Sequence, residues 1–329
     1  MKKRIILDVD TGSDDAVALM YACMSQEFEV LGVMVSFGNQ PLAYTLKNTL
    51  KIRELIGGSF KIYKGSAGPL VADLLPGSRL NTDIQSFEGV IDGKAVAVHQ
   101  KEFDLPEPEG REERIPAVIW LIDTLMNSSE PVTLVPVGPL TDIALALKVE
   151  PGICEKIQEI ICMGGGVNVA NMTPCAEINF YNDPEAAKVV LESGIRTTLI
   201  TLDATHSSWF GYEEAERIRK TGSRAGAFAA DLLINRIEAA NQLGARNVKK
   251  SALHDVLAVM YVSHPEVVTE VVRQKCDIDV GHGYARGGLF MDNRASASAK
   301  NPVYIAYRAD KDRMCSLLEQ ALGKTGTVN

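Results

Sequence analysis

Residues 4–21, which read RIILDVDTGSDDAVALMY, decide the fold of this chain. The apolar run at the start has the length of a β-strand and ends at Asp8, and an apolar helical pattern begins at Ala16. An acidic turn around Thr11 and Gly12 lies between them. The order strand, turn, helix places this turn at the carboxyl end of a strand, where open α/β sheets bind their ligands.

Four carboxylates crowd this turn within eight residues, namely Asp8, Asp10, Asp14 and Asp15. Charges of one sign this close together repel one another unless shared protons or a cation compensate. A hard divalent ion with oxygen ligands is the expected compensation. Capping of a helix N-terminus, the structural alternative, accounts for Asp14 or Asp15 but not for all four. The turn is therefore predicted to be a metal-binding or catalytic site.

Strand-like and helical segments alternate through most of the remaining chain. The predicted strands are residues 4–9, 29–36, 60–63, 132–136, 157–163 and 197–201. The predicted helices are residues 14–24, 42–56, 116–126, 140–147 and 184–192, followed by 212–221, 226–243 and 254–262. This alternation, with strands that are apolar on nearly every residue, indicates an α/β fold with a mainly parallel open sheet and helices on both faces.

Three features complete the predicted organisation. Residues 67–114 are rich in Gly, Pro and charge and lack periodicity, which predicts a functional lid or a mobile excursion. The helices of residues 205–265 are expected to pack as extra helices over the active-site end of the sheet, and two late strands to surround residues 281–294. No internal repeat or linker is visible, so residues 1–329 are predicted to form a single domain.

The composition of the 329-residue chain excludes several classes of protein. A net charge of −8 argues against a nucleic-acid-binding surface. No apolar stretch approaches transmembrane length, and the apolar run after the basic residues 2–4 is too short for a signal peptide. We therefore expect a cytoplasmic protein with no nucleic-acid or membrane partner. In that reducing compartment most of the six scattered cysteines are expected to be buried hydrophobic residues, with Cys175 a candidate for lining the site.

A second polar segment, residues 168–183, has the composition of a sugar-binding loop. It follows three glycines at the end of a predicted strand, where glycine allows the backbone to approach a ligand closely. Vicinal hydroxyl groups are best held by carboxylates and amides, and Glu177 and Asn179 would point to the same side of an extended segment. For any single Asn an ordinary polar loop is the alternative. No lysine follows the glycines, so a phosphate-binding loop is not indicated.

A third carboxylate for a cation at the acidic turn has to come from elsewhere in the chain. Asp255 is the candidate, because it lies at the start of a predicted helix after a loop; its alternative role is that of a helix N-cap. His254 directly precedes it and would protonate a leaving group, since the ordinary pKa of histidine lies near working pH. His206 is predicted to be mainly structural. His99 and His264 are predicted to lie at the surface.

Four sequence blocks resemble the nucleoside hydrolases, the inosine-uridine-preferring family of N-ribosyl hydrolases. They are DVDTGSDDAVA from residue 8, FGNQ at residues 37–40, MGGG and AEINFYNDPEAA within residues 163–187, and LHD at residues 253–255. Together they cover essentially the whole chain. The resemblance implies the Rossmann-like fold of that family, Ca²⁺ as cofactor, a nucleoside as small-molecule substrate, and a homodimer or homotetramer.

The same resemblance implies roles for individual residues. The implied metal ligands are the carboxylates of Asp10, Asp15 and Asp255 and the main-chain oxygen of Val137. The implied substrate-binding residues are Asp14, Asn39, Met163, Asn171, Glu177 and Asn179. Family members often carry Thr where this chain has Val137. Because the implied ligand is the main-chain oxygen, this difference in side chain should not affect metal binding.

The chain departs from the family in the region implied to recognise the base. Many members carry a His in a short HGxxG-like segment, where this chain has Ser86 and Phe87. Base recognition is therefore left open, with stacking on Phe87, Trp209 or Tyr212 as candidates. Each of these aromatic residues is alternatively a core residue.

These observations predict calcium-dependent hydrolysis of the N-glycosidic bond of ribonucleosides to ribose and free base. Asp10 is the predicted general base for a water molecule, and His254 is the predicted acid for the leaving base. One alternative is a haloacid-dehalogenase-type phosphatase with Asp8 as nucleophile and magnesium as cofactor. Another is a nucleoside-binding protein without catalytic activity.

Overall fold

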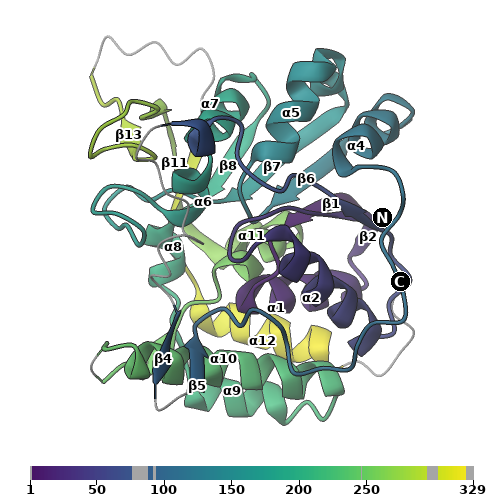
Figure 1. Cartoon of the computed structure of the whole chain (residues 1–329), viewed down its shortest axis with the longest axis vertical. Helices are drawn as coiled ribbons and strands as arrows, with labels where there is room; N and C mark the ends of the chain where they lie inside the picture. Colours follow the sequence, from purple (N-terminus) through teal and green to yellow (C-terminus); the bar gives the residue numbers. More distant parts are fainter. Residues whose placement is uncertain (1, 76–87, 92–93, 246, 295–302, 324–329) are drawn as a thin grey trace.

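A central eight-stranded sheet organises the described part of the chain, residues 2–75, 88–91, 94–245, 247–294 and 303–323 of a computed structural model (Figure 1). The strand order is β11-β14-β8-β7-β6-β1-β2-β3, and all neighbours are parallel except β11 and β14. The strands are β1 (Lys3–Val9), β2 (Phe28–Val35), β3 (Ile62–Lys64), β6 (Val132–Pro136), β7 (Ile157–Met163), β8 (Thr197–Ile200), β11 (Val268–Gln274) and β14 (Val303–Ala309). The predicted mainly parallel sheet is confirmed.

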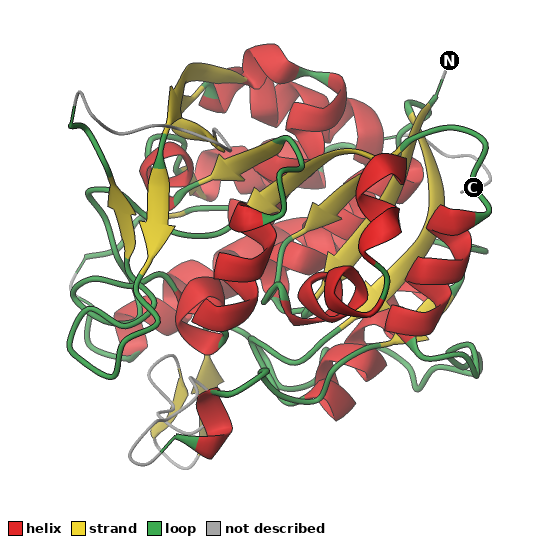
Figure 2. Ribbon diagram, turned by 90° about the horizontal axis from the view of Figure 1, so that it is seen from above, coloured by secondary structure: helices red, strands yellow, loops and turns green. Residues whose placement is uncertain are grey.

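Helices cover both faces of this sheet, as the view from above shows (Figure 2). On one face lie α1 (Ser13–Met24), α2 (Leu42–Leu55), α11 (His254–Ser263) and α12 (Lys311–Leu322). On the other face lie α4 (Ala117–Met126), α5 (Thr141–Val149) and α7 (Pro184–Glu192). The other described helices include α6 (Ile178–Asn182), α8 (Leu202–His206), α9 (Tyr212–Arg219) and α10 (Arg224–Gln242). Short strand pairs are β4 (Glu88–Ile91) with β5 (Lys94–Ala97), β9 (Phe210–Gly211) with β10 (Lys250–Ser251), and β12 (Cys276–Ile278) with β13 (Leu289–Met291).

Strand β1 shows why the central strands are apolar at nearly every position. Ile5 and Leu7 are buried in the hydrophobic cluster that contains α1, whereas Ile6 is buried in the cluster that contains α4 and α5. Successive side chains of a strand point to opposite faces of the sheet. A strand covered by helices on both faces therefore has to be apolar throughout.

The order of the strands reverses at β1, which has β2 on one side and β6 on the other. Open α/β sheets bind ligands at such a reversal, outside the carboxyl ends of the strands. The acidic turn follows β1 at this place. Val137 follows β6, and its N–H donates to Asp8 O at 2.8 Å. The reversal thus brings the ends of two strands, and the polar groups after them, to one edge of the sheet.

Some predicted elements differ from the structure. The strand predicted at residues 60–63 begins at Ile62, because its ladder with β2 covers three residue pairs only. The helix predicted from residue 226 begins at Arg224, since Ser223 Oγ accepts a hydrogen bond from Gly226 N at 2.8 Å and caps it. Helix α11 packs against α1 and β7 on a face of the sheet rather than over its end, because most of its side chains are apolar and buried.

Part of the segment predicted as a lid, residues 67–114, is held against α2. Lys51, a nearly buried residue of that helix, donates to Phe103 O at 2.8 Å. Asn48, one turn earlier, accepts a hydrogen bond from Phe103 N at 3.0 Å. Residues 76–87, which include Ser86 and Phe87, lie outside the described residues. The role of the segment as a lid stays a prediction.

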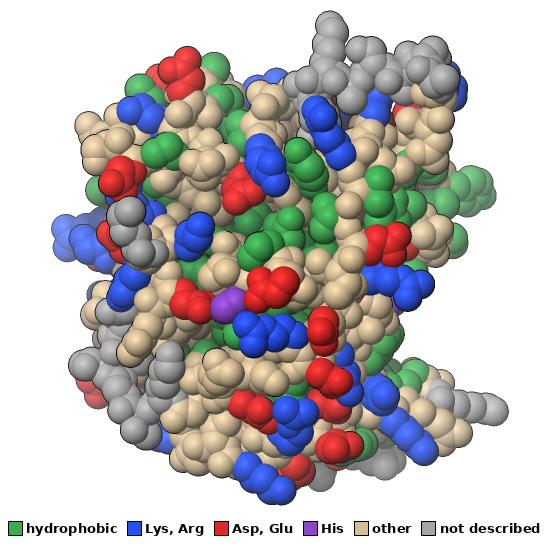
Figure 3. Space-filling view, turned by 180° about the vertical axis from the view of Figure 1, so that it is seen from behind, with side chains coloured by type: hydrophobic (Ala, Val, Ile, Leu, Met, Phe, Trp, Pro, Cys, Tyr) green, Lys and Arg blue, Asp and Glu red, His purple; other side chains and the backbone are tan. Residues whose placement is uncertain are grey.

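Exposed ion pairs on the surface add little to the stability of this fold. On the face seen from behind, acidic and basic side chains lie beside one another (Figure 3). Exposed ion pairs such as Arg219 with Asp231, at 2.8 Å, contribute little in water.

None of the helices described is both long enough and apolar enough to cross a membrane.

Asp183 joins three parts of the fold at the start of α7. Its Oδ1 accepts a hydrogen bond from Ala186 N at 3.0 Å and caps the helix. Its Oδ2 accepts from Thr141 Oγ1 at 2.6 Å and from Leu70 N at 2.8 Å. The side chain is completely buried. Asp183 thus caps α7 directly before Pro184 and has a structural role.

We expect Asp183→Ala to lower the free energy of unfolding by about 2–4 kcal/mol, because a helix cap is lost and two buried donors lose their acceptor. Asp183→Asn keeps one acceptor oxygen and should lose about half as much. Urea unfolding followed by circular dichroism measures both variants. Unchanged stability of Asp183→Ala would show that these three hydrogen bonds do not hold the fold together.

Candidate active site

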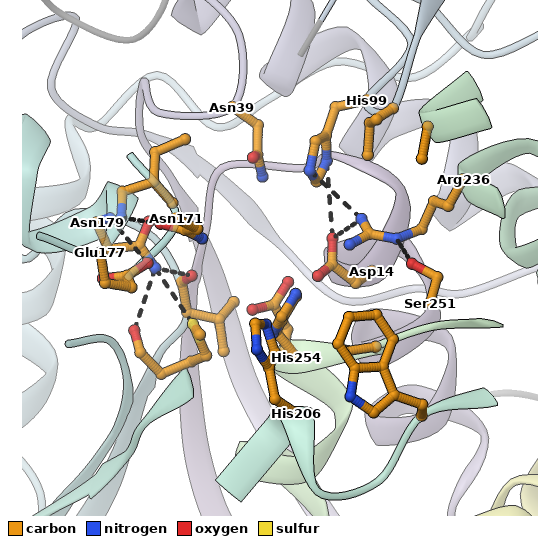
Figure 4. Close-up of a pocket in the computed structure, with 18 of the residues that line it drawn as sticks. Asp14, Asn39, His99, Asn171, Glu177, Asn179, His206, Arg236, Ser251 and His254 are labelled. Carbon is orange, nitrogen blue, oxygen red and sulfur yellow. Dashed lines mark hydrogen bonds and ion pairs between the residues drawn. The ribbon is translucent and has the colours of Figure 1, made fainter. Parts of the chain in front are cut away.

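A cavity of about 270 Å³ lies at the carboxyl ends of β1, β6 and β7 (Figure 4). The predicted site residues that line it are Asp14, Asn39, Val137, Met163, Asn171, Glu177, Asn179, His254 and Asp255. The two other predicted residues, Asp10 and Asp15, are buried and do not belong to the described lining. The fold therefore gathers residues from distant segments of the chain at one place.

Three carboxylates meet beside this cavity. Asp14, Asp15 and Asp255 each offer an oxygen atom, and these atoms lie within 4.8 Å of one another. Their side chains are 3%, 0% and 4% exposed, so water screens their charges poorly. Burial, together with the charges of Asp14, Asp15 and Asp10, raises the pKa of Asp255 well above its ordinary value. Like charges buried this close need protons or a cation.

Asp10 adds a fourth carboxylate to this group. Its Oδ2 accepts a hydrogen bond from Asn39 N at 2.6 Å, whereas Oδ1 is buried and has no partner among the described residues. Glycine is needed at positions 38 and 138, because a Cβ on either residue would collide with this carboxylate. Burial and the charge of Asp15 raise the pKa of Asp10 well above its ordinary value. A buried oxygen without a partner, close to further carboxylates, fits an oxygen-coordinated divalent cation.

Asp15 is held by donors from its own turn. It accepts hydrogen bonds from Asp10 N at 3.1 Å, Gly12 N at 3.0 Å and Asn39 Nδ2 at 2.9 Å. The bond from Gly12 N caps α1, so the capping role considered for this residue is present alongside its place in the carboxylate group. Burial and the charge of Asp14 raise the pKa of Asp15 to about 6.

Asp8 lies apart from this group, on the opposite face of β1. It is 1% exposed, and neither carboxylate oxygen has a hydrogen-bond partner within the described chain. Burial and the nearby charge of Asp142 raise its pKa well above the ordinary value. A nucleophile has to reach its substrate, whereas Asp8 is buried beside Asp142 and does not belong to the group of carboxylates next to the cavity. This placement argues against a phosphatase mechanism with Asp8 as nucleophile.

Glu177 and Asn179 lie on the opposite wall of the cavity, at the start of α6 (Figure 4). Glu177 caps this helix, since its carboxylate accepts from Asn179 N at 3.0 Å and from Phe180 N at 3.2 Å. The extended conformation expected for this segment is therefore wrong, because the cap starts a helical turn there. Asn179 Nδ2 donates to Val137 O at 2.8 Å and to Met163 O at 3.1 Å, which fixes both carbonyl groups at the cavity.

Asn171 completes this wall from the loop before α6. Its Oδ1 accepts a hydrogen bond from Ile178 N at 3.0 Å, which ties the loop to the helix. Burial raises the pKa of Glu177 to about 7, although main-chain N–H groups donate to its carboxylate. The wall thus presents amide and carboxyl groups to the cavity, as the sequence predicted for a sugar-binding segment.

His254 lies on the far side of the cavity from this wall (Figure 4). Its Nδ1 is 2.8 Å from Thr205 Oγ1, and its ring centroid is 5.6 Å from that of His206. Removal from water, together with the positive charge of Arg236, lowers the pKa of His254 to about 3 despite the opposing charge of Asp14. The expectation that this imidazole titrates near working pH is therefore wrong, and the side chain is neutral at pH 7.

Arg236 is a site residue that the sequence analysis missed. It extends from α10, is 4% exposed, and donates from Nη1 to Asp14 Oδ1 at 2.9 Å. Burial alone would raise the pKa of Asp14, but the guanidinium lowers it to about 2. The sequence held a signal for this residue, since the buried positions Leu232, Leu233 and Ile237 have a helical spacing that includes position 236.

His99 was also missed, because it was predicted to lie at the surface. Its side chain is 14% exposed and lines the cavity, with Nε2 at 3.3 Å from Arg236 Nη1. Burial and the Arg236 charge lower the pKa of His99 to about 4. No local pattern indicates this position, since it depends on how the segment after β5 folds back over the acidic turn. The other predicted surface histidine, His264, contacts Glu27 at 2.8 Å away from the cavity.

Of the aromatic residues considered for stacking on the base, the described cavity lining includes Trp209. This residue is 37% exposed and has its ring centroid 4.8 Å from that of His206. Tyr212 is exposed at the start of α9 and does not belong to the described lining. Phe87 lies outside the described residues. Cys175 is exposed, and the cavity lining described for this chain does not include it.

Comparison with known proteins agrees with the resemblance noted in the sequence. The family model described as inosine-uridine preferring nucleoside hydrolase matches residues 5–316. The pyrimidine-specific ribonucleoside hydrolase RihB of Escherichia coli strain SE11 is 33% identical over 322 residues, which cover 98% of this chain and 97% of the relative. RihB of Escherichia coli O157:H7 strain EC4115 is 30% identical with the same coverage.

Solved structures give the same result. The purine-preferring ribonucleoside hydrolase from Gardnerella vaginalis has a TM-score of 0.84 and 29% identity, with 98% of both chains covered. The inosine-uridine preferring nucleoside hydrolase from Bacillus anthracis, at 23% identity and a TM-score of 0.72, covers 98% of this chain and 99% of that one and shares the fold. The predicted family is confirmed, and so is an enzyme of the nucleoside hydrolase type. The chain belongs to the inosine-uridine preferring nucleoside hydrolases, a family of glycosidase-class N-ribosyl hydrolases.

Proposed function

We propose that the protein is a calcium-dependent hydrolase that splits ribonucleosides into ribose and free base. The observation that carries this proposal is the group of buried carboxylates beside a cavity whose opposite wall offers amide and carboxyl groups. The first feature suits a hard cation, and the second suits a polyol. A homodimer or homotetramer and a cytoplasmic location remain part of the proposal.

The chain offers an oxygen-only donor set for a divalent ion. The proposed ligands are the carboxylates of Asp10, Asp15 and Asp255 and the main-chain oxygen of Val137. Such a set without Cys or His suits calcium or magnesium rather than zinc. A divalent cation held there supplies positive charge that lowers the pKa of a water molecule. The free Oδ1 of Asp10 and the spacing of the neighbouring carboxylates support this assignment.

Residues of this chain would carry out the remaining steps. Asp10 would accept the proton of the water that attacks the anomeric carbon. The proposed ribose-binding residues are Asp14, Asn39, Met163, Asn171, Glu177 and Asn179. The sugar becomes positively charged as the C–N bond breaks, and the surrounding carboxylates stabilise that charge.

His254 is the proposed donor to the leaving base. Because its pKa is about 3, it acts as a neutral imidazole that donates from Nε2. Thr205 Oγ1, at 2.8 Å from Nδ1, would donate to that nitrogen and so keep the proton on Nε2. A neutral imidazole in a buried site can polarise a substrate group in this way.

A panel of nucleosides tests the proposed function. The protein is incubated with uridine, cytidine, inosine and adenosine, and release of reducing sugar is measured. A generic phosphate ester serves as the control for phosphatase activity. Binding of a nucleoside without release of sugar would favour the non-catalytic alternative and overturn the proposal.

We expect activity to need bound calcium. Metal analysis should find about one ion per chain, because the oxygen ligands form one site. Removal with a chelator should lower Tm, since an ion that binds only the folded state stabilises it and shields the carboxylates from one another. Differential scanning calorimetry with and without added calcium measures this effect. A fully active preparation with less than about a tenth of an ion per chain would contradict the prediction.

We expect Asp10→Asn to reduce kcat by roughly three orders of magnitude, because the general base and one ligand charge are both lost. Asp123→Asn, on the exposed surface of α4, is the matched control and should keep wild-type kcat. Steady-state kinetics on the best nucleoside of the panel provides the comparison. If folded Asp10→Asn retains near wild-type turnover, the general base lies elsewhere.

We expect His254→Ala to slow hydrolysis of a natural nucleoside by about two to four orders of magnitude, the usual range for assistance by a proton donor. The same variant should hydrolyse p-nitrophenyl riboside nearly as fast as the wild type, because nitrophenolate leaves without a proton. Parallel kinetics on both substrates measure the difference. Equal losses on the two would mean that His254 supports ribose binding or Asp255 instead.

A further inference from the structure

Arg236 faces the part of the cavity that the proposed ribose-binding wall leaves free. It enters from α10, and Glu177 and Asn179 lie on the opposite side (Figure 4). Its side chain is 5% exposed and carries a positive charge. A buried permanent cation next to a nucleoside site is suited to a group that becomes negative during the reaction.

Four polar contacts fix the orientation of this guanidinium, one of them between Nη1 and His99 Nε2 at 3.3 Å. Nη1 donates to Asp14 Oδ1 at 2.9 Å and to Ser13 Oγ at 2.8 Å, and Nε donates to Ser251 Oγ at 3.1 Å. Nη2 has no hydrogen-bond partner in the part of the chain that the structure describes. Nη2 is not one of the buried side-chain atoms that lack a partner, and Arg236 lines the cavity. This nitrogen is therefore open to a ligand atom that can accept a hydrogen bond.

The bond between Arg236 and Asp14 relates this donor to the substrate. Asp14 is proposed to hold a ribose hydroxyl near the anomeric carbon, and the base is attached to that carbon. In a pyrimidine nucleoside the O2 carbonyl lies directly next to the glycosidic bond, on the side of the 2′-hydroxyl. An atom in that position is within reach of a guanidinium already bound to Asp14.

We propose that Arg236 donates a hydrogen bond from Nη2 to O2 of a pyrimidine ribonucleoside, and that this contact makes pyrimidine ribonucleosides the favoured substrate class. The inference rests on the proposed function and adds a catalytic residue to it. Arginine is the suitable side chain, because one nitrogen holds Asp14 while another reaches the base.

The chemistry of the leaving group favours this role. As the bond between C1′ and N1 breaks, both electrons go to the base, while water adds to C1′ and gives its proton to Asp10. The negative charge of the departing pyrimidine spreads from N1 to O2, where a guanidinium stabilises it. The base then takes up one proton from solvent water and leaves as the neutral pyrimidine, and Asp10 returns to solvent the proton that it took from the attacking water. A purine is activated by protonation at N7, which lies far from this donor.

The test compares Arg236→Lys with the wild type on uridine, inosine and p-nitrophenyl riboside. For uridine, kcat/KM should fall about 10- to 100-fold, because a charged hydrogen bond to the leaving group is lost. For p-nitrophenyl riboside, which has no O2, and for inosine, which is activated at N7, the loss should stay below about threefold. Arg286→Lys is the matched control: Arg286 is buried and paired with Glu185 at 2.9 Å, away from the cavity, and its variant should match the wild type on all three substrates.

Two outcomes would overturn the inference while leaving the proposed function intact. Equal losses on all three substrates would mean that Arg236 only positions Asp14, which every riboside needs. No loss on uridine would mean that Nη2 does not contact the base. If Arg236→Lys lowers Tm by more than about 5 °C, Arg236→Gln is measured in the same way. A wild-type protein that hydrolyses none of these ribosides would overturn the proposed function and this inference together.

Discussion

Mutual repulsion of buried carboxylates is the constraint on which the rest of this structure depends. Asp10, Asp14, Asp15 and Asp255 lie near one another with almost no water to screen them. The surrounding chain supplies the compensation that a protein can provide: main-chain N–H groups of the acidic turn, the amide of Asn39, and the guanidinium of Arg236. The negative charge that these donors do not compensate leaves a position that suits a cation. The reversal of strand order at β1 determines where this place lies.

Much of the fold and the acidic turn of the site followed from the sequence, because those features are local, whereas residues such as Asn39, Val137 and Met163 were implied by the family resemblance. The run from β1 through the acidic turn to α1 is set by neighbouring residues, and so are the cap at Asp183 and the apolar strands. The positions of Arg236 and His99 depend on contacts between segments more than a hundred residues apart. The alternating spacing of Glu177 and Asn179 predicted an extended segment. The side chain of Glu177 instead caps a helix there, and an alternating pattern does not reveal such a cap.

The two ends of the cavity are built in different ways. The end proposed for the metal and ribose lies at the ends of central strands, whose positions the sheet fixes. The end proposed for the base is formed by α10, α8 and the segment that carries His99, which lie outside the sheet. Relatives named for pyrimidine and for purine substrates resemble this chain over nearly its whole length. A shared fold in which the end proposed for the base is formed by separate elements accounts for relatives that are named for different bases.

The contacts of Phe103 with Lys51 and Asn48 fix one point of the segment that carries His99. Beyond this point the segment can change in length without a change in the shape of the site. Because α2 holds the chain on both sides of the Phe103 peptide group, the wall formed by His99 has an anchor a few residues away. Insertions or deletions after Phe103 are absorbed beyond this anchor, so the length of residues 104–114 can change while His99 keeps its place in the wall. Changes before His99 are not separated from the wall by this anchor. The wall can therefore vary from that side while the carboxylates at the ends of the central strands keep their places.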